Sequence, residues 1–193
     1  MTHPHATIDR GPTLLLIARG AIAEKLGMAG ASVPAAGWLD EPGASFVTLK
    51  RHGSLRGCVG TLVPIEPLGE DVASNARAAA FQDSRFPPLS VSEWPDTDIE
   101  VSVLSPLEPI RYESKHHLLT LLRPHVDGLV MEWEGHKGAF LPQVWDQVAD
   151  PAEFLVHLTQ KAGLPQDFWD DQIRISRFTV ARFHEEAGVG SRR

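Results

Sequence analysis

The order of the elements that the sequence predicts favours an α+β fold, with a mixed, mainly antiparallel sheet and flanking helices. Two observations support this prediction. Apolar residues recur at helical spacing in several segments, and most of the other apolar runs are joined in pairs by short turns. Such turns connect antiparallel strands, whereas parallel strands need long crossovers. The length of 193 residues is typical of one domain, or of two small ones that share a core.

The first predicted element is a helix in which Leu15, Ala18, Ile22 and Leu26 recur at helical spacing. Gly27 stands where this helix would end, because glycine readily takes the left-handed conformation of a helix terminus. The helix therefore begins the folded part of the chain and presents one apolar face to a core.

A strand over residues 45–50, a turn over 51–54 and a strand over 55–62 predict a hairpin. The clearest helix follows over residues 67–81, where proline stands in the first turn and acidic side chains lie at the positive end of the helix dipole. Residues 83–90 contain two consecutive prolines among polar and aromatic side chains, so we expect an ordered loop.

Apolar and polar residues alternate over residues 99–103, which predicts a half-buried strand. Ser114 is a suitable N-cap for a short helix that runs to about Leu122. A second hairpin is predicted over residues 129–141, with its turn at residues 134–136.

Residues 150–163 carry a typical helix start, aspartate followed by proline, and end on glycine. Residues 173–183 predict a long strand, but its apolar phase shifts between Ile175 and Phe178, so we expect a bulge or a break there. Residues 1–12 and 186–193 lie outside these patterns, and we expect a flexible leader and a flexible tail.

The composition excludes several classes of protein. The chain carries 18 basic and 25 acidic residues and a formal charge of −7, which disfavours binding to nucleic acid or to an anionic membrane. A single cysteine excludes an internal disulfide and a tetrathiolate metal site, and it suits a reducing cytoplasm. The longest early apolar run, residues 14–18, is too short for a signal sequence or a membrane span. We therefore expect a cytoplasmic protein.

Well-known cofactor and catalytic motifs are missing from the sequence. The nine histidines show no zinc-protease spacing, and there is no phosphate-binding glycine loop, dinucleotide fingerprint or serine nucleophile elbow. No cofactor and no metal ion is therefore predicted.

The densest chemical signal is the sequence Leu-Arg-Gly-Cys-Val-Gly at residues 55–60. In a strand, Arg56 and Cys58 would share one face, and a neighbouring guanidinium stabilises a thiolate. Gly57 and Gly60 would leave the backbone bare, so that a ligand can approach closely. Cys58 is thus a candidate nucleophile; the alternative is a small buried residue that only packs.

A second cluster, Asp83-Ser84-Arg85-Phe86-Pro87-Pro88, directly follows the clearest helix. Arg85 is suited to hold a carboxylate or phosphate group with two hydrogen bonds, and Asp83 would orient it. The alternative is an aspartate–arginine pair that only fixes a turn in a loop stiffened by proline.

Six segments, in this order and at compatible spacing, carry a resemblance to a known family: residues 46–50, 55–60, 79–88, 99–104, 141–144 and 161–164. Together they resemble the AMMECR domain family, also called AmmeMemoRadiSam system protein A, over about residues 14–185. The family usually has isoleucine at the position of Val59, which is a minor departure.

The resemblance implies an α+β fold with a larger and a smaller subdomain that are intertwined, so we expect one domain over residues 13–185. It implies a cleft that carries the Arg56, Gly57, Cys58 and Gly60 strand, with Asp83 and Arg85 opposite and Gln143 as a weaker addition. Microbial members are commonly encoded beside a Memo-like protein and a radical S-adenosylmethionine enzyme, which are therefore the expected partners.

Two functions remain open at this point. In the first, the protein is an enzyme or an enzyme subunit that works with those partners, with Cys58 and Arg56 as catalytic residues and an anionic small molecule bound in the cleft. In the second, it is a non-catalytic binding or adaptor module, and Cys58 only packs.

Overall fold

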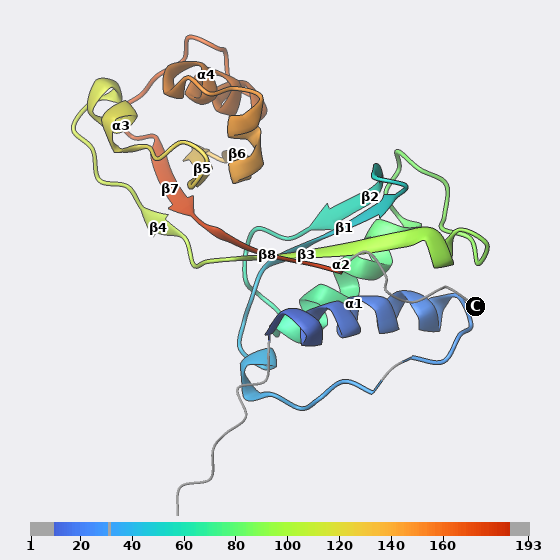
Figure 1. The fold of residues 1–193 in the computed structure, drawn as a ribbon. Coiled ribbons are helices and arrows are strands. Elements are labelled where there is room, and N and C mark those ends of the chain that lie inside the picture. The colour runs from blue at the N-terminus through green and yellow to red at the C-terminus, as the bar shows by residue number, and fades with distance from the viewer. Residues whose placement is uncertain (1–9, 31, 186–193) are drawn as a thin grey trace, which may run out of the picture. The chain divides into compact units, whose positions relative to one another are not determined.

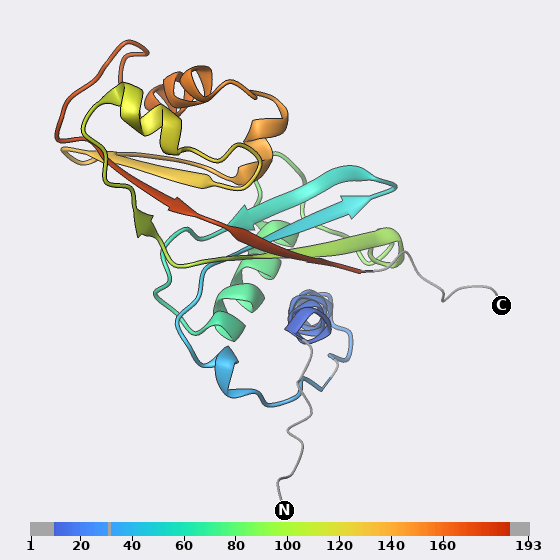
Figure 2. The same cartoon turned by 60° about the vertical axis from the view of Figure 1, so that its left-hand side comes forward.

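The computed structural model describes residues 10–30 and 32–185, and Figures 1 and 2 show it as a ribbon. Residues 10–12 of the expected leader belong to the first helix; the rest of that leader and the expected tail, 186–193, lie outside the described residues. The chain divides into two compact units, one formed by Met1–Leu104 with Ala181–Arg193 and the other by Ser105–Val180.

The described residues of the first unit form two α-helices and two short 3-10 helices beside a four-stranded sheet. In chain order its elements are α1 (Arg10–Lys25), η1 (Gly37–Leu39), β1 (Ser45–Arg51), β2 (Ser54–Gly60), α2 (Leu68–Phe81), η2 (Trp94–Asp96), β3 (Thr97–Leu104) and β8 (Val180–His184). The strand order is β2-β1-β3-β8, and β1 pairs antiparallel with both β2 and β3. Strand β2 therefore lies at an edge of the sheet.

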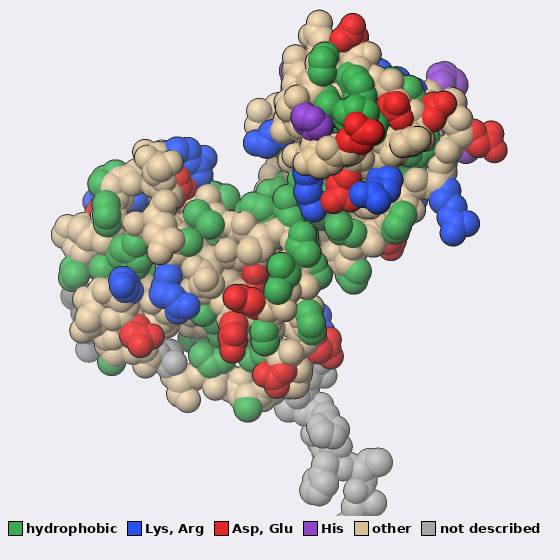
Figure 3. Space-filling model, turned by 180° about the vertical axis from the view of Figure 1, so that it is seen from behind, with side chains coloured by type: hydrophobic (Ala, Val, Ile, Leu, Met, Phe, Trp, Pro, Cys, Tyr) green, Lys and Arg blue, Asp and Glu red, His purple; other side chains and the backbone are tan. Residues whose placement is uncertain are grey.

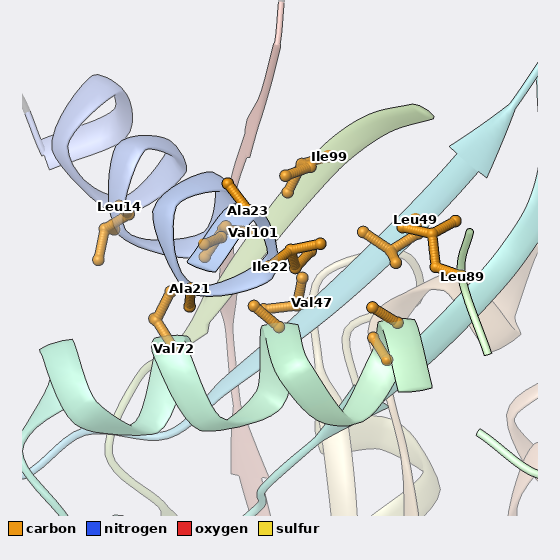
Figure 4. Close-up of a cluster of buried hydrophobic side chains, with 14 of the residues drawn as sticks. Leu14, Ala21, Ile22, Ala23, Val47, Leu49, Val72, Leu89, Ile99 and Val101 are labelled. Atoms are coloured by element: carbon orange, nitrogen blue, oxygen red, sulfur yellow. The ribbon is translucent and has the colours of Figure 1, made fainter. Parts of the chain in front are cut away.

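Helices α1 and α2 pack on each other and on one face of this sheet (Figures 1 and 2). The core between them is built from the apolar positions of each element, as Figure 4 shows for Leu14 and Ile22 of α1, Val72 of α2 and Val47 and Leu49 of β1. Because side chains alternate along a strand, the residues between these core positions face away from both helices.

The second unit contains a second four-stranded sheet. Its elements are β4 (Glu108–Pro109), α3 (Lys115–Leu121), β5 (Gly128–Trp133), β6 (His136–Phe140), η3 (Pro142–Asp146), α4 (Pro151–Lys161) and β7 (Arg174–Phe178), with strand order β4-β7-β5-β6. Ser114 and Asp150 cap α3 and α4 as predicted. The core of this unit includes Trp145 stacked on Phe154 at a ring distance of 3.7 Å.

The predicted strand over residues 173–183 is divided between the two sheets. Strand β7 continues through Phe178 and β8 begins at Val180, so the break lies at Thr179 and not between Ile175 and Phe178. The apolar phase shifts because the chain leaves one sheet and enters the other. Thr179 is the residue between the two strands. Its backbone carbonyl accepts a hydrogen bond from the backbone N–H of Ser105.

The α+β prediction is confirmed, and the antiparallel strands form two sheets. Both predicted hairpins are present, as β1–β2 and β5–β6. The loop over residues 83–90 is ordered, because Phe86 N–H donates to the Asp83 carbonyl and Leu89 is buried. This loop brings Asp83 and Arg85 back toward the edge of the first sheet.

Candidate functional site

Cys58 lies on the edge strand β2, on the sheet face opposite α1 and α2. Its cross-strand partner on β1 is Thr48, and the partner of Thr48 on β3 is Glu100. The Thr48 hydroxyl donates a hydrogen bond to Cys58 Sγ at 3.3 Å. Cys58 is half-buried, so its sulfur lies on a polar face and is not part of the apolar core.

Asp83 and Arg85 bind the backbone of Cys58 on the open edge of the sheet. Cys58 N–H donates to Asp83 Oδ2 at 2.9 Å, and Arg85 Nη2 donates to the Cys58 carbonyl at 3.3 Å. These two bonds occupy the positions that a neighbouring strand would fill, which protects an edge strand from pairing with other chains. The structure thus brings together Cys58, Asp83 and Arg85, which the resemblance placed in one site; their role in a site stays a prediction.

Asp83 and Arg85 also form a bidentate pair with each other. Arg85 Nε donates to Asp83 Oδ1 at 2.9 Å, and Arg85 Nη2 donates to Oδ2 at 2.6 Å. The hydrogen bonds from Arg85 hold the pKa of the Asp83 carboxyl well below its usual range, with further help from the Cys58 N–H, although burial opposes this shift. The carboxylate is therefore charged at every physiological pH.

Arg85 keeps part of its hydrogen-bonding capacity free. The bond to Asp83 raises the pKa of Arg85, with smaller contributions from its attraction to Asp83 and to Cys58. Its side chain is 55% exposed, and Nη1 makes no hydrogen bond within the described part of the chain. A fixed guanidinium with two free N–H donors beside a half-exposed thiol can hold an anionic group.

Arg56 has other partners. A register shift between Leu49 and Lys50 leaves Arg56 without a cross-strand partner, so the regular two-residue alternation behind the prediction does not continue through this residue. Its guanidinium is buried and donates to Glu93 Oε1 at 3.0 Å, to Glu93 Oε2 at 3.1 Å and to the Pro87 carbonyl at 2.9 Å. These contacts tie the loop that carries Arg85 to β2.

Glu93 is a functional candidate that the sequence reasoning missed. Hydrogen bonds, first from Arg56 and then from the Ser90 backbone, lower its pKa to about 2. Arg51 Nη1 also approaches Glu93, at 3.4 Å. The spacing Ser90-x-x-Glu93 is a local signal, since the Ser90 backbone N–H and hydroxyl both donate to Glu93. Its arginine partners could not be predicted locally, because Arg51 and Arg56 lie 42 and 37 residues away in the chain.

Thr48 is the second missed residue, and here a signal exists. It alternates with the apolar residues Val47 and Leu49, which places it on the face away from the core. The predicted hairpin, with its turn at residues 51–54, would place Thr48 opposite Gly57. The register shift between Leu49 and Lys50, which the sequence did not reveal, places it opposite Cys58 instead.

Both predicted glycines have a packing role. A Cβ on Gly57 would overlap the backbone carbonyl oxygen of Ala79, so β2 can approach α2 this closely only through glycine. A Cβ on Gly60 would overlap the ring of Phe46 and the carbonyl of Ser45. The space next to each α-carbon is thus filled by protein.

Gln143 lies in η3 of the second unit, and the other predicted site residues lie in the first. Its Oε1 is buried and has no hydrogen-bond partner within the described residues. Its role in the site stays a prediction.

The described residues contain no group of three or more side chains suited to hold a metal ion. They also contain no helix with the length and apolar character that crossing a bilayer requires. Acidic and basic side chains both occur on each unit over the face drawn in Figure 3.

Comparison with known proteins gives consistent matches. The model of the AMMECR1 family matches residues 15–183. A protein of Methanothermobacter thermautotrophicus is 42% identical over 187 residues, which cover 92% of this chain and 95% of that protein. One from Thermococcus onnurineus is 44% identical over 158 residues, covering 75% and 74%. The crystal structure of an uncharacterized protein from Pyrococcus horikoshii is 36% identical and superposes with a TM-score of 0.80 over 91% of each chain.

Proposed function

The chain belongs to the AMMECR1 family, and we propose that it is an enzyme or an enzyme subunit that acts on an anionic small molecule beside Cys58. The free Nη1 of Arg85 supports this proposal most directly. Arg85 is held against the Cys58 carbonyl, its guanidinium is more than half exposed, and two of its donors are unused within the described residues.

Each residue of the site has a proposed role. Cys58 is the nucleophile or the acid–base group, and the Thr48 hydroxyl that donates to its sulfur stabilises a negative charge there. Arg85 holds the anionic group of the substrate, and Asp83 fixes Arg85 in place. Arg56 was predicted to be catalytic; its bonds to Glu93 and Pro87 favour a positioning role, which the experiment below distinguishes.

The expected partners are a Memo-like protein and a radical S-adenosylmethionine enzyme, as the resemblance implies. A cytoplasmic location would suit both these partners and the free thiol. The alternative function is a binding or adaptor module for the same partners. It is favoured by the packing roles of Gly57 and Gly60, which leave no open space at those two positions for a ligand.

Alkylation of Cys58 by two reagents tests the site directly, because the chain has no other cysteine. Iodoacetamide is neutral and iodoacetate is anionic; in both, the Sγ–carbon bond forms and iodide leaves. A guanidinium about 4 Å from the anion contributes about 1 kcal/mol in water, or about fivefold in rate. We therefore expect Arg85→Gln to lower the ratio of the iodoacetate rate to the iodoacetamide rate by about fivefold.

Arg123→Gln is the matched control, since Arg123 is 51% exposed and also donates two side-chain hydrogen bonds to a nearby aspartate, Asp127. It should leave the ratio unchanged. Arg56→Gln should change both rates together if Arg56 positions the loop, and should change the ratio if it binds the anion. Labelling of Cys58 only after unfolding, or an unchanged ratio in Arg85→Gln, would contradict the proposed site.

Co-purification with the two partner proteins separates the enzyme from the adaptor. We expect Cys58→Ser to keep any complex with them and to abolish substrate turnover by that complex. If the Cys58→Ser variant still binds the two partner proteins and the complex still turns over substrate, the result would support the adaptor function.

A further inference from the structure

A hollow lies in the first unit, between α1, α2 and the loop that follows α1. Its volume is about 460 Å³, within the range of small-molecule sites. The side chains relevant here are Ile17, Ala21 and Glu24 of α1, Ala73 and Arg77 of α2, and Val33 of the loop. Cys58, Asp83 and Arg85 do not line it, and within the described residues none of them forms a hydrogen bond or ion pair with a residue that does, so the inference drawn here does not depend on the function proposed above.

Helical spacing explains why these side chains line one space. Ile17, Ala21 and Glu24 follow one another at intervals of four and three residues, and Ala73 and Arg77 at an interval of four. Residues at such intervals share one face of a helix. Because α1 and α2 pack on each other, the two faces are held in place by the core beneath them.

The two charged side chains of the hollow are unpaired. Arg77 is half-buried, yet neither Arg77 nor Glu24 has a side-chain hydrogen bond or an ion pair within the described part of the chain, and they do not pair with each other. Arg19, Arg56 and Arg85 of this unit each bind a carboxylate, whereas Arg10, Arg77 and Arg182 have no ion pair within the described residues. Arg77 is half-buried and therefore has hydrogen-bonding capacity that the described residues do not use.

The chemistry of the lining defines a ligand. A guanidinium binds a carboxylate with two hydrogen bonds, and a glutamate binds an ammonium group. Ile17, Val33 and the two alanines offer an apolar wall beside these charges. We propose that the hollow binds a zwitterionic aliphatic amino acid, with its carboxylate on Arg77, its ammonium group at Glu24 and its side chain on the apolar wall.

L-Leucine is the probe, and binding is followed by calorimetry and by amide chemical shifts of the isotope-labelled full chain. Two analogues each lack one charge: 4-methylpentanoate has no ammonium group, and 3-methylbutylamine has no carboxylate. We expect leucine to bind with a Kd of about 1 mM or tighter, and each analogue to bind about tenfold more weakly. The shifts should change at residues of α1 and α2 that line the hollow.

Variants locate the site. Arg77→Gln and Glu24→Gln should each weaken leucine binding about tenfold, and Ala73→Leu should block it by filling the hollow. Arg174→Gln, an exposed arginine of the second unit, should have no effect. Urea unfolding of each variant shows that it remains folded. The proposal is overturned if leucine causes no shift changes at about 10 mM, if either analogue binds as well as leucine, or if Arg77→Gln binds normally.

Discussion

Each unit of the molecule contains an aspartate that holds a nearby arginine in nearly the same way. Asp83 accepts bonds from the backbone N–H, Nε and Nη2 of Arg85 at 3.1, 2.9 and 2.6 Å. Asp127 accepts the same three from Arg123 at 3.0, 2.9 and 2.6 Å. The two arginines are also similarly exposed, at 55% and 51%. The side-chain donors of Arg85 reach both oxygens of Asp83, whereas those of Arg123 both reach Asp127 Oδ1. The three donors and the bond lengths do not distinguish the two pairs.

The surroundings of the two aspartate–arginine pairs do distinguish them. Asp83 also accepts the backbone N–H of Cys58, so its pair contacts an edge strand that carries a thiol. Asp127 is fully buried; its backbone carbonyl accepts the indole N–H of Trp145, and Arg177 Nη1 lies 3.6 Å from its carboxylate. The second pair thus holds a packed core together. An aspartate–arginine pair is evidence for a site only when its remaining contacts lead to a reactive group.

Replacement of each aspartate by alanine should separate these two roles. The loss of stability in Asp127→Ala is the largest effect that we expect. Asp127→Ala leaves Arg177 and the Arg123 N–H without their buried acceptor, and should cost about 3 kcal/mol or more of unfolding free energy. Asp83→Ala should cost about 1–2 kcal/mol, since Arg85 can turn to solvent. Urea unfolding measures both.

Asp146→Ala is the control, because Asp146 is an exposed carboxylate that meets only His125, and it should change stability by less than about 0.5 kcal/mol. A loss in Asp83→Ala as large as that in Asp127→Ala would show that both pairs serve mainly the fold.

The pH dependence of stability should show how much the charged Asp83 carboxylate, next to Cys58, contributes to the folded state. The pKa of Asp83 lies below its ordinary value of 3.8 in the folded protein, because Arg85 and the Cys58 N–H favour the charged form. A folded-state pKa below the unfolded one adds stability that is complete above the unfolded value and is lost as the pH falls toward the folded value. The stability difference between the native protein and Asp83→Asn should therefore shrink below about pH 4.

Glu93→Gln should behave likewise over a known range, because the pKa of Glu93 falls from 4.5 to about 2, chiefly through the bonds from Arg56. Its stabilising effect should be full above about pH 4.5 and decline toward pH 2. Urea unfolding from about pH 7 to about pH 3 covers the upper part of both ranges. A constant difference over that range would contradict the low pKa values.

Among the residues of the site, Cys58→Ser should have the smallest effect on stability, below about 1 kcal/mol, because Cys58 is half-buried and a serine hydroxyl can accept the bond from Thr48. Val59→Ala is the matched control: the neighbouring side chain packs against the apolar core, and its truncation should cost about 1–2 kcal/mol. Thermal unfolding compares the two. A larger loss in Cys58→Ser than in Val59→Ala would indicate that Cys58 serves packing.

Much of this protein was determined by the sequence alone. The helices, the two hairpins and the caps at Ser114 and Asp150 follow from spacing and from side chains that bond to backbone groups a few residues away. The proximity of Asp83 and Arg85 to Cys58 was predicted from the family resemblance. These features depend on contacts within one element or between neighbouring ones.

Tertiary structure alone decided the partner of Arg56, the filled space beside Gly57 and the division of residues 173–183 between two sheets. A register shift on β2 releases Arg56 from regular pairing, and only the folded loop brings Glu93 to it. Likewise, Gly57 packs against the backbone of α2, and the distance between β2 and α2 is set by the packing of the whole core. Local sequence encodes periodicity and local hydrogen bonds, whereas distant partners are chosen by how the elements pack.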